Sequence, residues 1–341
     1  MKRVLITGGA GFIGSNFVRY ALRTHDDWSI TVVDLLTYAG NLENLSDLLG
    51  NERIQFVKAD IVDRGKMGEL FSEGFDYVFN FAAETHVDRS IHDPHAFIRT
   101  DVNGTFTLLE GARHYPVERF VQVSTDEVYG SLSEGSASED APLMPTSPYA
   151  ASKAGADRLA FSYFATYRVP VIIIRPSNNF GPYQHLEKFI PLFITNALTD
   201  QPLPLYGDGQ YVRDWLYVED HCEAIDLICG KGNQGEVYNI GADSDQTNIV
   251  VARGILDLLG KPHSLIRHVK DRPGHDRRYA VNWSRLRDLG WSPTRTFEQA
   301  LKETVDWYVS NESWWKNIKS GEFASYYRQQ YGSDASANAR D

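Results

Sequence analysis

The amino-terminal segment passes from a β-branched stretch straight into a glycine-rich turn, and few folds accept that order. Residues 3–7 predict a strand, and residues 12–24 have the periodicity of an amphipathic helix. Between them, Gly8, Gly11 and Gly14 form a GxxGxxG pattern. Such glycines permit a tight turn, close approach of the backbone to a pyrophosphate and close packing of helix on strand. Because a helix N-terminus also offers N–H donors, the unit predicts a dinucleotide-binding turn.

A carboxylate at the end of the second predicted strand narrows the choice of dinucleotide. Asp34 ends residues 29–34 and lies 20 residues after Gly14, where it can accept hydrogen bonds from ribose hydroxyls. It would repel a 2′-phosphate, so the sequence favours NAD over NADP. Phe12 and Ile13 lie within the same glycine turn, and we expect them to contact the cofactor.

Predicted strands alternate with predicted helices through the first half of the chain. The strands are residues 3–7, 29–34, 54–58, 77–81, 120–124 and 171–175, and the helices are residues 12–24, 64–73, 94–114 and 148–168. This alternation indicates βαβ crossovers, which give a parallel sheet with helices on both faces. The sequence therefore predicts an α/β fold with a doubly wound parallel Rossmann sheet.

The pattern changes after residue 176. Longer loops and short strands such as 237–240 separate helices predicted near residues 188–198, 219–229, 247–259 and 296–310. This indicates a second, smaller mixed α/β substrate domain. We expect the cofactor domain at residues 1–176, the second domain at 177–318 and a partly flexible C-terminal extension at 319–341. The first boundary is approximate, because the chain can cross back.

Charge and cysteine content exclude several kinds of function. Lys and Arg number 34 against 45 Asp and Glu among 341 residues, a net charge of −11, so the broad positive field of a nucleic-acid-binding protein is lacking. Cys222 and Cys229 form no CxxC pair, and we expect neither a disulfide framework nor a metal. No apolar run approaches the ~20 residues that span a bilayer, and no signal peptide precedes the first strand. We expect a cytoplasmic protein without a membrane partner.

Tyr149 and Lys153 form a candidate catalytic pair. They lie four residues apart, directly after Pro148, a residue suited to the start of a helix. This spacing puts both side chains on one helical face, where an ammonium lowers a phenol pKa that is normally about 10. Tyr149 could then act as a base near neutral pH. Such a pair alone is more often a solvated surface pair, but Ser124-Thr125 at the end of an earlier strand favours catalysis.

Together the glycine turn, Thr125, Tyr149 and Lys153 resemble the extended short-chain dehydrogenase/reductase superfamily that acts on nucleotide sugars, over about residues 1–318. The resemblance implies that Tyr149 removes a proton from a sugar hydroxyl while NAD⁺ takes the hydride from the same carbon. It also implies that Lys153 orients the nicotinamide ribose and that the Thr125 hydroxyl holds the reacting oxygen.

Two adjacent carboxyl groups, Asp126 and Glu127, follow Thr125 directly. Elimination of water beside a ketone needs a base for one proton and an acid for the departing hydroxyl. The pair supplies both if Asp126 stays protonated and Glu127 ionised. Successive strand residues point to opposite faces, so both can face a substrate only if the strand has ended by Thr125, which Gly130 favours. Alone, the pair could equally be a solvated acidic loop.

Further segments narrow the resemblance to one family. Besides residues 125–127, they lie at residues 38–41, 81–90, 177–184, 206–209, 212–215 and 271–278. These segments are similar to those of the dTDP-glucose 4,6-dehydratases, although Thr85 and Phe180 stand where Ser and Tyr are more usual.

The family implies conversion of dTDP-glucose to dTDP-4-keto-6-deoxyglucose. Tyr149 and NAD⁺ would oxidise carbon 4 to a ketone. Glu127 would remove the proton at carbon 5 while Asp126 protonates the departing carbon-6 hydroxyl. The hydride would then return to carbon 6 and a proton to carbon 5.

The same resemblance implies which residues hold each ligand. For the cofactor it adds Asp60, Ile61, Ala82, Ala83 and Thr100. For the substrate it gives Thr85, Asn178, Glu187, Lys188, Arg213, Asn248, Arg272, His275 and Tyr279. In an acidic chain a sugar diphosphate needs local cations, and guanidinium groups suit phosphate well. A homodimer through the helices at residues 94–114 and 148–168 is also implied.

Three alternatives stay open. The Asp126-Glu127 pair opposes an epimerase or decarboxylase on the same scaffold. The number of matching segments opposes a dehydratase for another nucleotide. The presence of Tyr149 and Lys153 opposes a non-catalytic NAD-binding sensor, in which Tyr149→Phe would leave every property intact.

Overall fold

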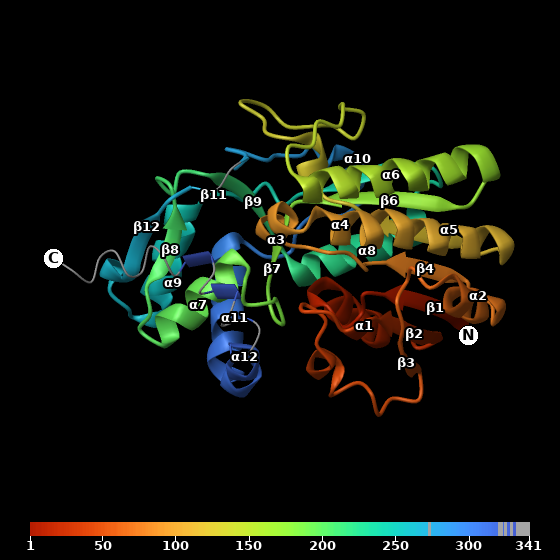
Figure 1. Ribbon diagram of the computed structural model, residues 1–341, viewed down its shortest axis with the longest axis horizontal. Helices are drawn as coiled ribbons and strands as arrows, with labels where there is room; N and C mark the ends of the chain where they lie inside the picture. The colour runs from red at the N-terminus through yellow and green to blue at the C-terminus, as the bar shows by residue number, and fades with distance from the viewer. Residues whose placement is uncertain (272–273, 320–322, 324–325, 328–329, 332–341) are drawn as a thin grey trace.

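A sheet of seven parallel strands forms the centre of the larger of two bodies in the computed structural model (Figure 1). Its order is β10-β6-β5-β4-β1-β2-β3. The strands are β1 (Lys2–Thr7), β2 (Trp28–Asp34), β3 (Ile54–Lys58), β4 (Tyr77–Asn80), β5 (Arg119–Val123), β6 (Val171–Pro176) and β10 (Val237–Ile240). The order reverses at β1, which pairs with both β2 and β4, so the predicted doubly wound parallel sheet is confirmed. The structure describes residues 1–271, 274–319, 323, 326–327 and 330–331.

Both faces of this sheet are buried under helices. Val4 and Ile6 of β1 lie in one apolar core with Ile225, whereas Leu5 between them lies in a second core with Phe71. Helices α1 (Phe12–Thr24) and α8 (Val218–Lys231) contribute to the first core, and α2 (Arg64–Ser72), α5 (Thr105–His114) and α6 (Pro148–Tyr167) to the second. A parallel sheet covered in this way offers ligands the crevice at the carboxyl ends of its strands.

The chain crosses back from the smaller body to the large sheet. Helix α8 packs against α1, and β10 pairs in parallel with β6. Trp283 and Leu286, beside and within α10 (Ser284–Asp288), belong to the core that α1 and α8 share. A division at residue 176 therefore does not separate the two bodies, and residues 237–240 form a strand of the Rossmann sheet rather than of the second domain.

The single helix expected at residues 94–114 consists of three segments. They are α4 (Pro94–Phe97), the π-helical segment η2 (Ile98–Gly104) and α5, and α3 (Val87–His92) precedes them. Gly104 ends the π-helical segment where an added Cβ would lie 2.3 Å from Ile61 Cδ1. Periodicity in the sequence predicts one continuous helix there, because it does not distinguish a short π-helical segment from the α-helical turns around it.

The smaller body is mixed α/β and carries its own core (Figure 1). Strands β7 (Asn178–Phe180), β9 (Val212–Tyr217) and β11 (Asp245–Thr247) form one sheet, and β8 (Leu203–Tyr206) pairs with β12 (Ile266–Val269). Its helices are α7 (Phe189–Leu198), α9 (Asn248–Leu259), α11 (Phe297–Ser310) and α12 (Glu312–Lys319). In addition, the larger body has the short 3₁₀ turns η1 (Leu42–Leu45) and η3 (Asp126–Tyr129), and the smaller body has η4 (His263–Leu265).

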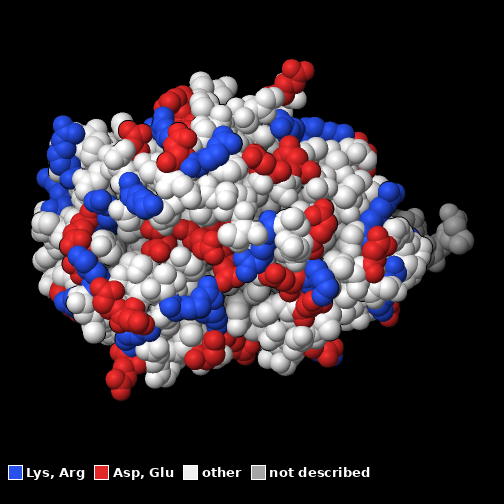
Figure 2. Space-filling model, turned by 180° about the vertical axis from the view of Figure 1, so that it is seen from behind, with Lys and Arg blue, Asp and Glu red and all other residues white. Residues whose placement is uncertain are grey.

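Charged side chains of both signs lie on the surface of the protein. On the face in Figure 2, acidic and basic side chains are interspersed. In the described part of the chain, no helix combines the length and apolar character that crossing a bilayer requires. Most of the extension expected at 319–341 lies outside the described residues.

The return of α8 to the large sheet can be tested by a cavity mutation. Ile225 is fully buried, so Ile225→Ala should lower the free energy of unfolding by about 2–5 kcal/mol through lost burial and the cavity left behind. Denaturant unfolding measures this. Val250→Ala on α9, where the side chain is 48% exposed, should change it by less than about 0.5 kcal/mol. Equal effects of the two variants would contradict the placement of α8.

Candidate active site

One crevice runs along the carboxyl ends of the central strands and the first loops of the smaller body. The residues that the sequence suggested for the cofactor all line it: Gly8, Gly11, Phe12, Ile13, Gly14, Asp34, Asp60, Ile61, Ala82, Ala83, Thr100, Tyr149 and Lys153. The suggested catalytic residues Thr125, Asp126 and Glu127 line it too. The fold therefore brings these two sets of residues, which are far apart in sequence, into one cavity.

The glycine turn leaves no room for side chains. A Cβ on Gly8 would lie 2.5 Å from the backbone nitrogen of Ala82, and one on Gly14 would lie 2.3 Å from the carbonyl oxygen of Gly8. Gly8 also has a φ of +67°, a conformation that side chains disfavour. The turn thus passes directly against the end of β4, and its backbone is exposed toward the crevice.

Asp34 lines the crevice beside the glycine turn. Its Oδ2 accepts a hydrogen bond from the Ala10 N–H at 3.0 Å, and its Oδ1 accepts one from the Leu36 N–H at 2.8 Å. Burial raises the pKa of Asp34, whereas these two donors lower it. A carboxylate has about four acceptor positions, so two remain for ribose hydroxyls.

Strand β5 ends before the carboxyl pair, and this end decides where the pair points. The strand stops at Val123, and Thr125 caps the 3₁₀ turn η3, its Oγ1 accepting a hydrogen bond from the Glu127 N–H at 3.3 Å. In a 3₁₀ turn, neighbouring side chains no longer alternate between opposite faces as they do in a strand. Asp126 and Glu127 can therefore both line the crevice.

The two carboxyl groups differ in their surroundings. Asp126 is buried, whereas Glu127 is only half-buried. Burial, and next the charge of Glu127, raise the pKa of Asp126 to about 8. Asp126 therefore keeps its proton at neutral pH and is suited to act as an acid.

Helix α6 presents Tyr149 and Lys153 to the same crevice. The Ser147 hydroxyl caps the helix by accepting a hydrogen bond from the Ala150 N–H at 3.1 Å, and Pro148 occupies its first turn. The Lys153 ammonium donates to the carbonyl oxygen of Val123 at 2.7 Å. The cation is therefore held against the end of β5.

The pKa of Tyr149 differs from the sequence-based expectation. Burial, followed by the charges of Glu127 and Asp101, raises it well above 10, and a hydrogen bond with Thr125 acts in the opposite direction. Burial also lowers the pKa of Lys153. The four-residue spacing predicts that Tyr149 and Lys153 share one helical face. It gives no information about how strongly burial desolvates the Tyr149 phenol.

Buried polar atoms at the crevice indicate a ligand site. Among the residues that the structure describes, Ser124 Oγ, Asp126 Oδ2 and Asn178 Oδ1 are buried without a hydrogen-bond partner. Each such atom costs about 1–3 kcal/mol, a cost that a bound ligand can relieve. With the side-chain-free glycine turn, they fit a dinucleotide at one end and a polar substrate beside Asp126.

Part of the predicted substrate set lies at this crevice. Thr85, Asn178 and Lys188 line it, and Lys188 Nζ donates to the Thr85 carbonyl oxygen. Arg213 lies over the ring of Tyr279, 4.5 Å from its centroid. Burial, and next the charge of Glu127, raise the pKa of Tyr279, which places this pair near the carboxyl groups.

Glu187, His275 and Asn248, three further members of that set, do not line the crevice. Glu187 Oε2 accepts a hydrogen bond from Arg89 Nε at 2.9 Å, and His275 stacks on Tyr211 with ring centroids 3.7 Å apart. Asn248 begins α9 and its N–H donates to the Tyr211 carbonyl. Arg272 lies outside the described residues.

Sequence patterns do not single out Asp101 and Glu84, two acidic residues near helix α6. Asp101 accepts hydrogen bonds from Ser152 Oγ at 2.5 Å and from the Glu84 N–H at 3.0 Å. Burial raises the pKa of Asp101 to about 6, and burial followed by the charge of Asp101 raises that of Glu84 to about 7. Asp101 lies in the π-helical segment η2. Such a segment changes the direction of its side chains, and no sequence pattern indicates it.

Comparison with known proteins identifies the family of the chain. The profile of the GDP-mannose 4,6 dehydratase family matches residues 5–304. This chain belongs to that family. A dTDP-glucose 4,6-dehydratase of Xanthomonas campestris pv. campestris strain B100 is 51% identical over 346 residues, covering 95% of this chain and 97% of the relative.

Solved structures of family members share the fold. DesIV, a dTDP-glucose 4,6-dehydratase from Streptomyces venezuelae with NAD bound, has a TM-score of 0.90 at 48% identity, covering 93% of this chain and all of its own. The dTDP-glucose 4,6-dehydratase from Bacillus anthracis in complex with NAD has a TM-score of 0.88 at 49% identity, covering 94% of this chain and all of its own. The expected family and fold class are therefore confirmed.

The raised pKa of Asp126 predicts a pH-dependent stability. The folded state keeps the proton up to about pH 8, whereas the unfolded state loses it above about pH 4, so this group makes stability fall as pH rises between these values. Asp126→Asn removes that slope. Its unfolding free energy relative to wild type should improve by about 1.4 kcal/mol per pH unit between pH 5 and 7.

Denaturant unfolding at pH 5, 6 and 7 measures this slope. Val250→Ala is the control, because it removes an exposed side chain and no titratable group, so its difference from wild type should stay constant with pH. A constant difference for Asp126→Asn as well would show that Asp126 is ionised in the folded protein.

Proposed function

We propose that the chain is an NAD-dependent dTDP-glucose 4,6-dehydratase that forms dTDP-4-keto-6-deoxyglucose. The observation that carries the proposal is the carboxyl pair on η3, with Asp126 protonated, at one crevice with Thr125, Tyr149 and Lys153. Oxidation and re-reduction of a sugar need only the last three residues. An acid and a base beside them supply what elimination of water needs in addition.

The first task of the site is to oxidise carbon 4. Tyr149 accepts the proton of the carbon-4 hydroxyl, and the Thr125 hydroxyl, which lies next to it, holds the same oxygen. Bound NAD supplies a positive charge that favours the Tyr149 phenolate and a place to store hydride between carbon 4 and carbon 6. The glycine turn, Asp34 and Lys153 would hold it.

The second task is elimination across carbons 5 and 6. A ketone at carbon 4 acidifies the proton at carbon 5, and Glu127 removes it. Asp126 gives its proton to the carbon-6 hydroxyl, which leaves as water. When the hydride returns to carbon 6 and a proton to carbon 5, the net change is the loss of one water.

Cations near the crevice suit the diphosphate of the substrate. Lys188 lines the crevice, and Arg213 lies over Tyr279 near the carboxyl pair. Arginine and lysine are the side chains that pair best with phosphate oxygens. We therefore assign the diphosphate to the side of the crevice formed by the smaller body, opposite the glycine turn.

Incubation with dTDP-glucose tests the proposal. Mass spectrometry should find a sugar nucleotide lighter by one water, with the alkali-induced absorbance of a 4-keto sugar. Tyr149→Phe lacks the proton acceptor and should lower the rate by about 10²- to 10⁴-fold. Tyr163→Phe, farther along α6 and outside the crevice, should stay near wild type.

The other outcomes separate the alternatives. Turnover of GDP-mannose or UDP-glucose in place of dTDP-glucose would keep the site and refute the substrate. Inversion of a hydroxyl without loss of water would indicate an epimerase. Absence of turnover with all three sugars would favour the sensor.

We also propose a homodimer through α6 and the adjoining π-helical segment. Phe161 and Tyr167 of α6 are 39% and 46% exposed, and Ile98 of η2 is 48% exposed. Apolar residues gathered on packed helices are typical of a covered surface. The double variant Ile98→Glu, Phe161→Glu should be monomeric by light scattering, whereas Val309→Glu on α11 should behave as wild type. A monomeric wild-type chain would refute the dimer.

A further inference from the structure

A buried ion pair anchors the catalytic helix to the neighbouring strand. Asp157 lies one helical turn beyond Lys153 on α6, Arg175 lies on β6, and their exposures are 0% and 1%. Arg175 donates from Nε to Asp157 Oδ2 at 2.8 Å and from Nη2 to Oδ1 at 3.0 Å. A two-point bond of this kind fixes orientation as well as distance. Helix α6 therefore cannot slide along β6 without breaking it.

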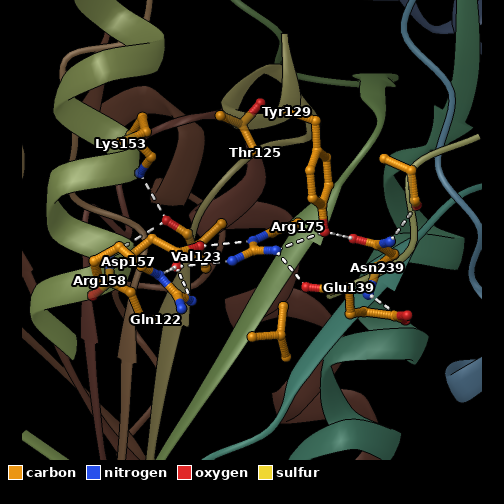
Figure 3. Close-up of polar contacts among 12 residues, drawn as sticks. Gln122, Val123, Thr125, Tyr129, Glu139, Lys153, Asp157, Arg158, Arg175 and Asn239 are labelled. Atoms are coloured by element: carbon orange, nitrogen blue, oxygen red, sulfur yellow. Dashed lines mark hydrogen bonds and ion pairs between the residues drawn. The ribbon is translucent and has the colours of Figure 1, made fainter. Parts of the chain in front are cut away.

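The third nitrogen of Arg175 reaches the turn that carries the carboxyl pair (Figure 3). Its Nη1 donates to the Tyr129 hydroxyl at 2.7 Å and to the Glu139 carbonyl oxygen at 3.0 Å. The Tyr129 hydroxyl donates in turn to Asn239 Oδ1 on β10 at 2.8 Å. Tyr129 is the last residue of η3, so its hydroxyl joins α6, β6 and β10 to that turn.

The turn η3 is a single 3₁₀ turn of four residues. At its ends the Val128 N–H donates to the Thr125 carbonyl over a long 3.4 Å, and the Gly130 N–H donates to the Glu127 carbonyl at 3.1 Å, while from outside the Met144 N–H donates to the Val128 carbonyl at 2.9 Å. A single 3₁₀ turn has poorer hydrogen-bond geometry than an α-helix. A side-chain anchor at its end therefore has a large share in deciding where its carboxyl groups point.

We propose that Tyr129 and Arg175 are positioning residues that set the place of the Asp126–Glu127 pair relative to Tyr149, and so control the elimination step. The inference rests on the proposed function. Through Arg175, one buried group holds both the helix that carries the oxidation pair and the turn that carries the elimination pair.

Stability alone does not account for this network. Replacing a buried ion pair with well-packed apolar residues of similar volume is often neutral or stabilising. The directional bonds from one guanidinium to a carboxylate, a phenol and a carbonyl instead impose one geometry on the elements around it.

Tyr129→Phe tests the inference, because it removes the hydroxyl link and keeps the ring and the Asp157–Arg175 pair. Misplacement of the carboxyl groups should lower kcat for dTDP-glucose by about 10- to 100-fold with little change in KM. In quenched single turnovers, mass spectrometry should find the keto sugar that has lost two hydrogens but no water accumulating before product. Deuterium at carbon 5 should slow the variant more than wild type.

Tyr163→Phe is the matched control. Tyr163 lies on the same helix and is also buried, and its hydroxyl donates to Glu110 at 2.7 Å, away from the crevice. Arg175→Lys provides a second lesion, because a lysine cannot hold Asp157 at two points and reach Tyr129 as well. It should act in the same direction as Tyr129→Phe. Single-turnover rates per bound substrate do not depend on how much protein folds, so poor yield cannot imitate the effect.

The outcomes separate the inference from the function beneath it. Wild-type turnover, with Tyr129→Phe equal to Tyr163→Phe or slowed equally in oxidation and elimination, would overturn the positioning role and leave the proposed function standing. Lack of dTDP-glucose turnover by the wild type would overturn both. Selective accumulation of the keto sugar supports the role.

Discussion

Burial of both faces of the parallel sheet is the constraint on which the rest of the structure depends. When helices cover each face, as α1 and α8 do on one side and α5 and α6 on the other, the strand ends are the part of the sheet left open to ligands. All seven strands run in one direction, so their carboxyl ends meet at one edge. The glycine turn, Asp34 and the Thr125–Glu127 run follow different strands and still line one crevice.

Structural features that depend on local chemistry can be predicted from the sequence. The glycine turn, the helix start at Pro148 and the strand at 54–58 depend on residue types within a few positions, and the structure has them where expected. The assignment of residues 237–240 to the second domain was wrong, because a four-residue strand pattern does not specify which sheet the strand joins. The roles of Asp101 and Glu84 likewise depend on a π-helical segment and on burial, which periodicity does not report.

Burial shifts the pKa values of the acidic groups near the crevice more than neighbouring charges do. Burial is the first cause of the raised pKa values of Asp126, Asp101 and Glu84, and the neighbouring carboxylates add to it for Asp126 and Glu84. Asp126, whose pKa is about 8, keeps its proton at neutral pH, so this buried acid adds no negative charge to the crevice. Burial of an acid is therefore one way in which an acidic chain can avoid repelling an anionic ligand from a crevice.

The repeated passage of the chain between the two bodies has a mechanical consequence. Each passage, before β7, at α8, after β10 and again near α10, is a covalent tether across the crevice. With several tethers, the two bodies cannot swing apart about a single hinge, because opening would bend several segments at once. A large ligand that spans the floor of such a crevice leaves slowly, so a dinucleotide held there would act as a resident group that survives many cycles of substrate exchange.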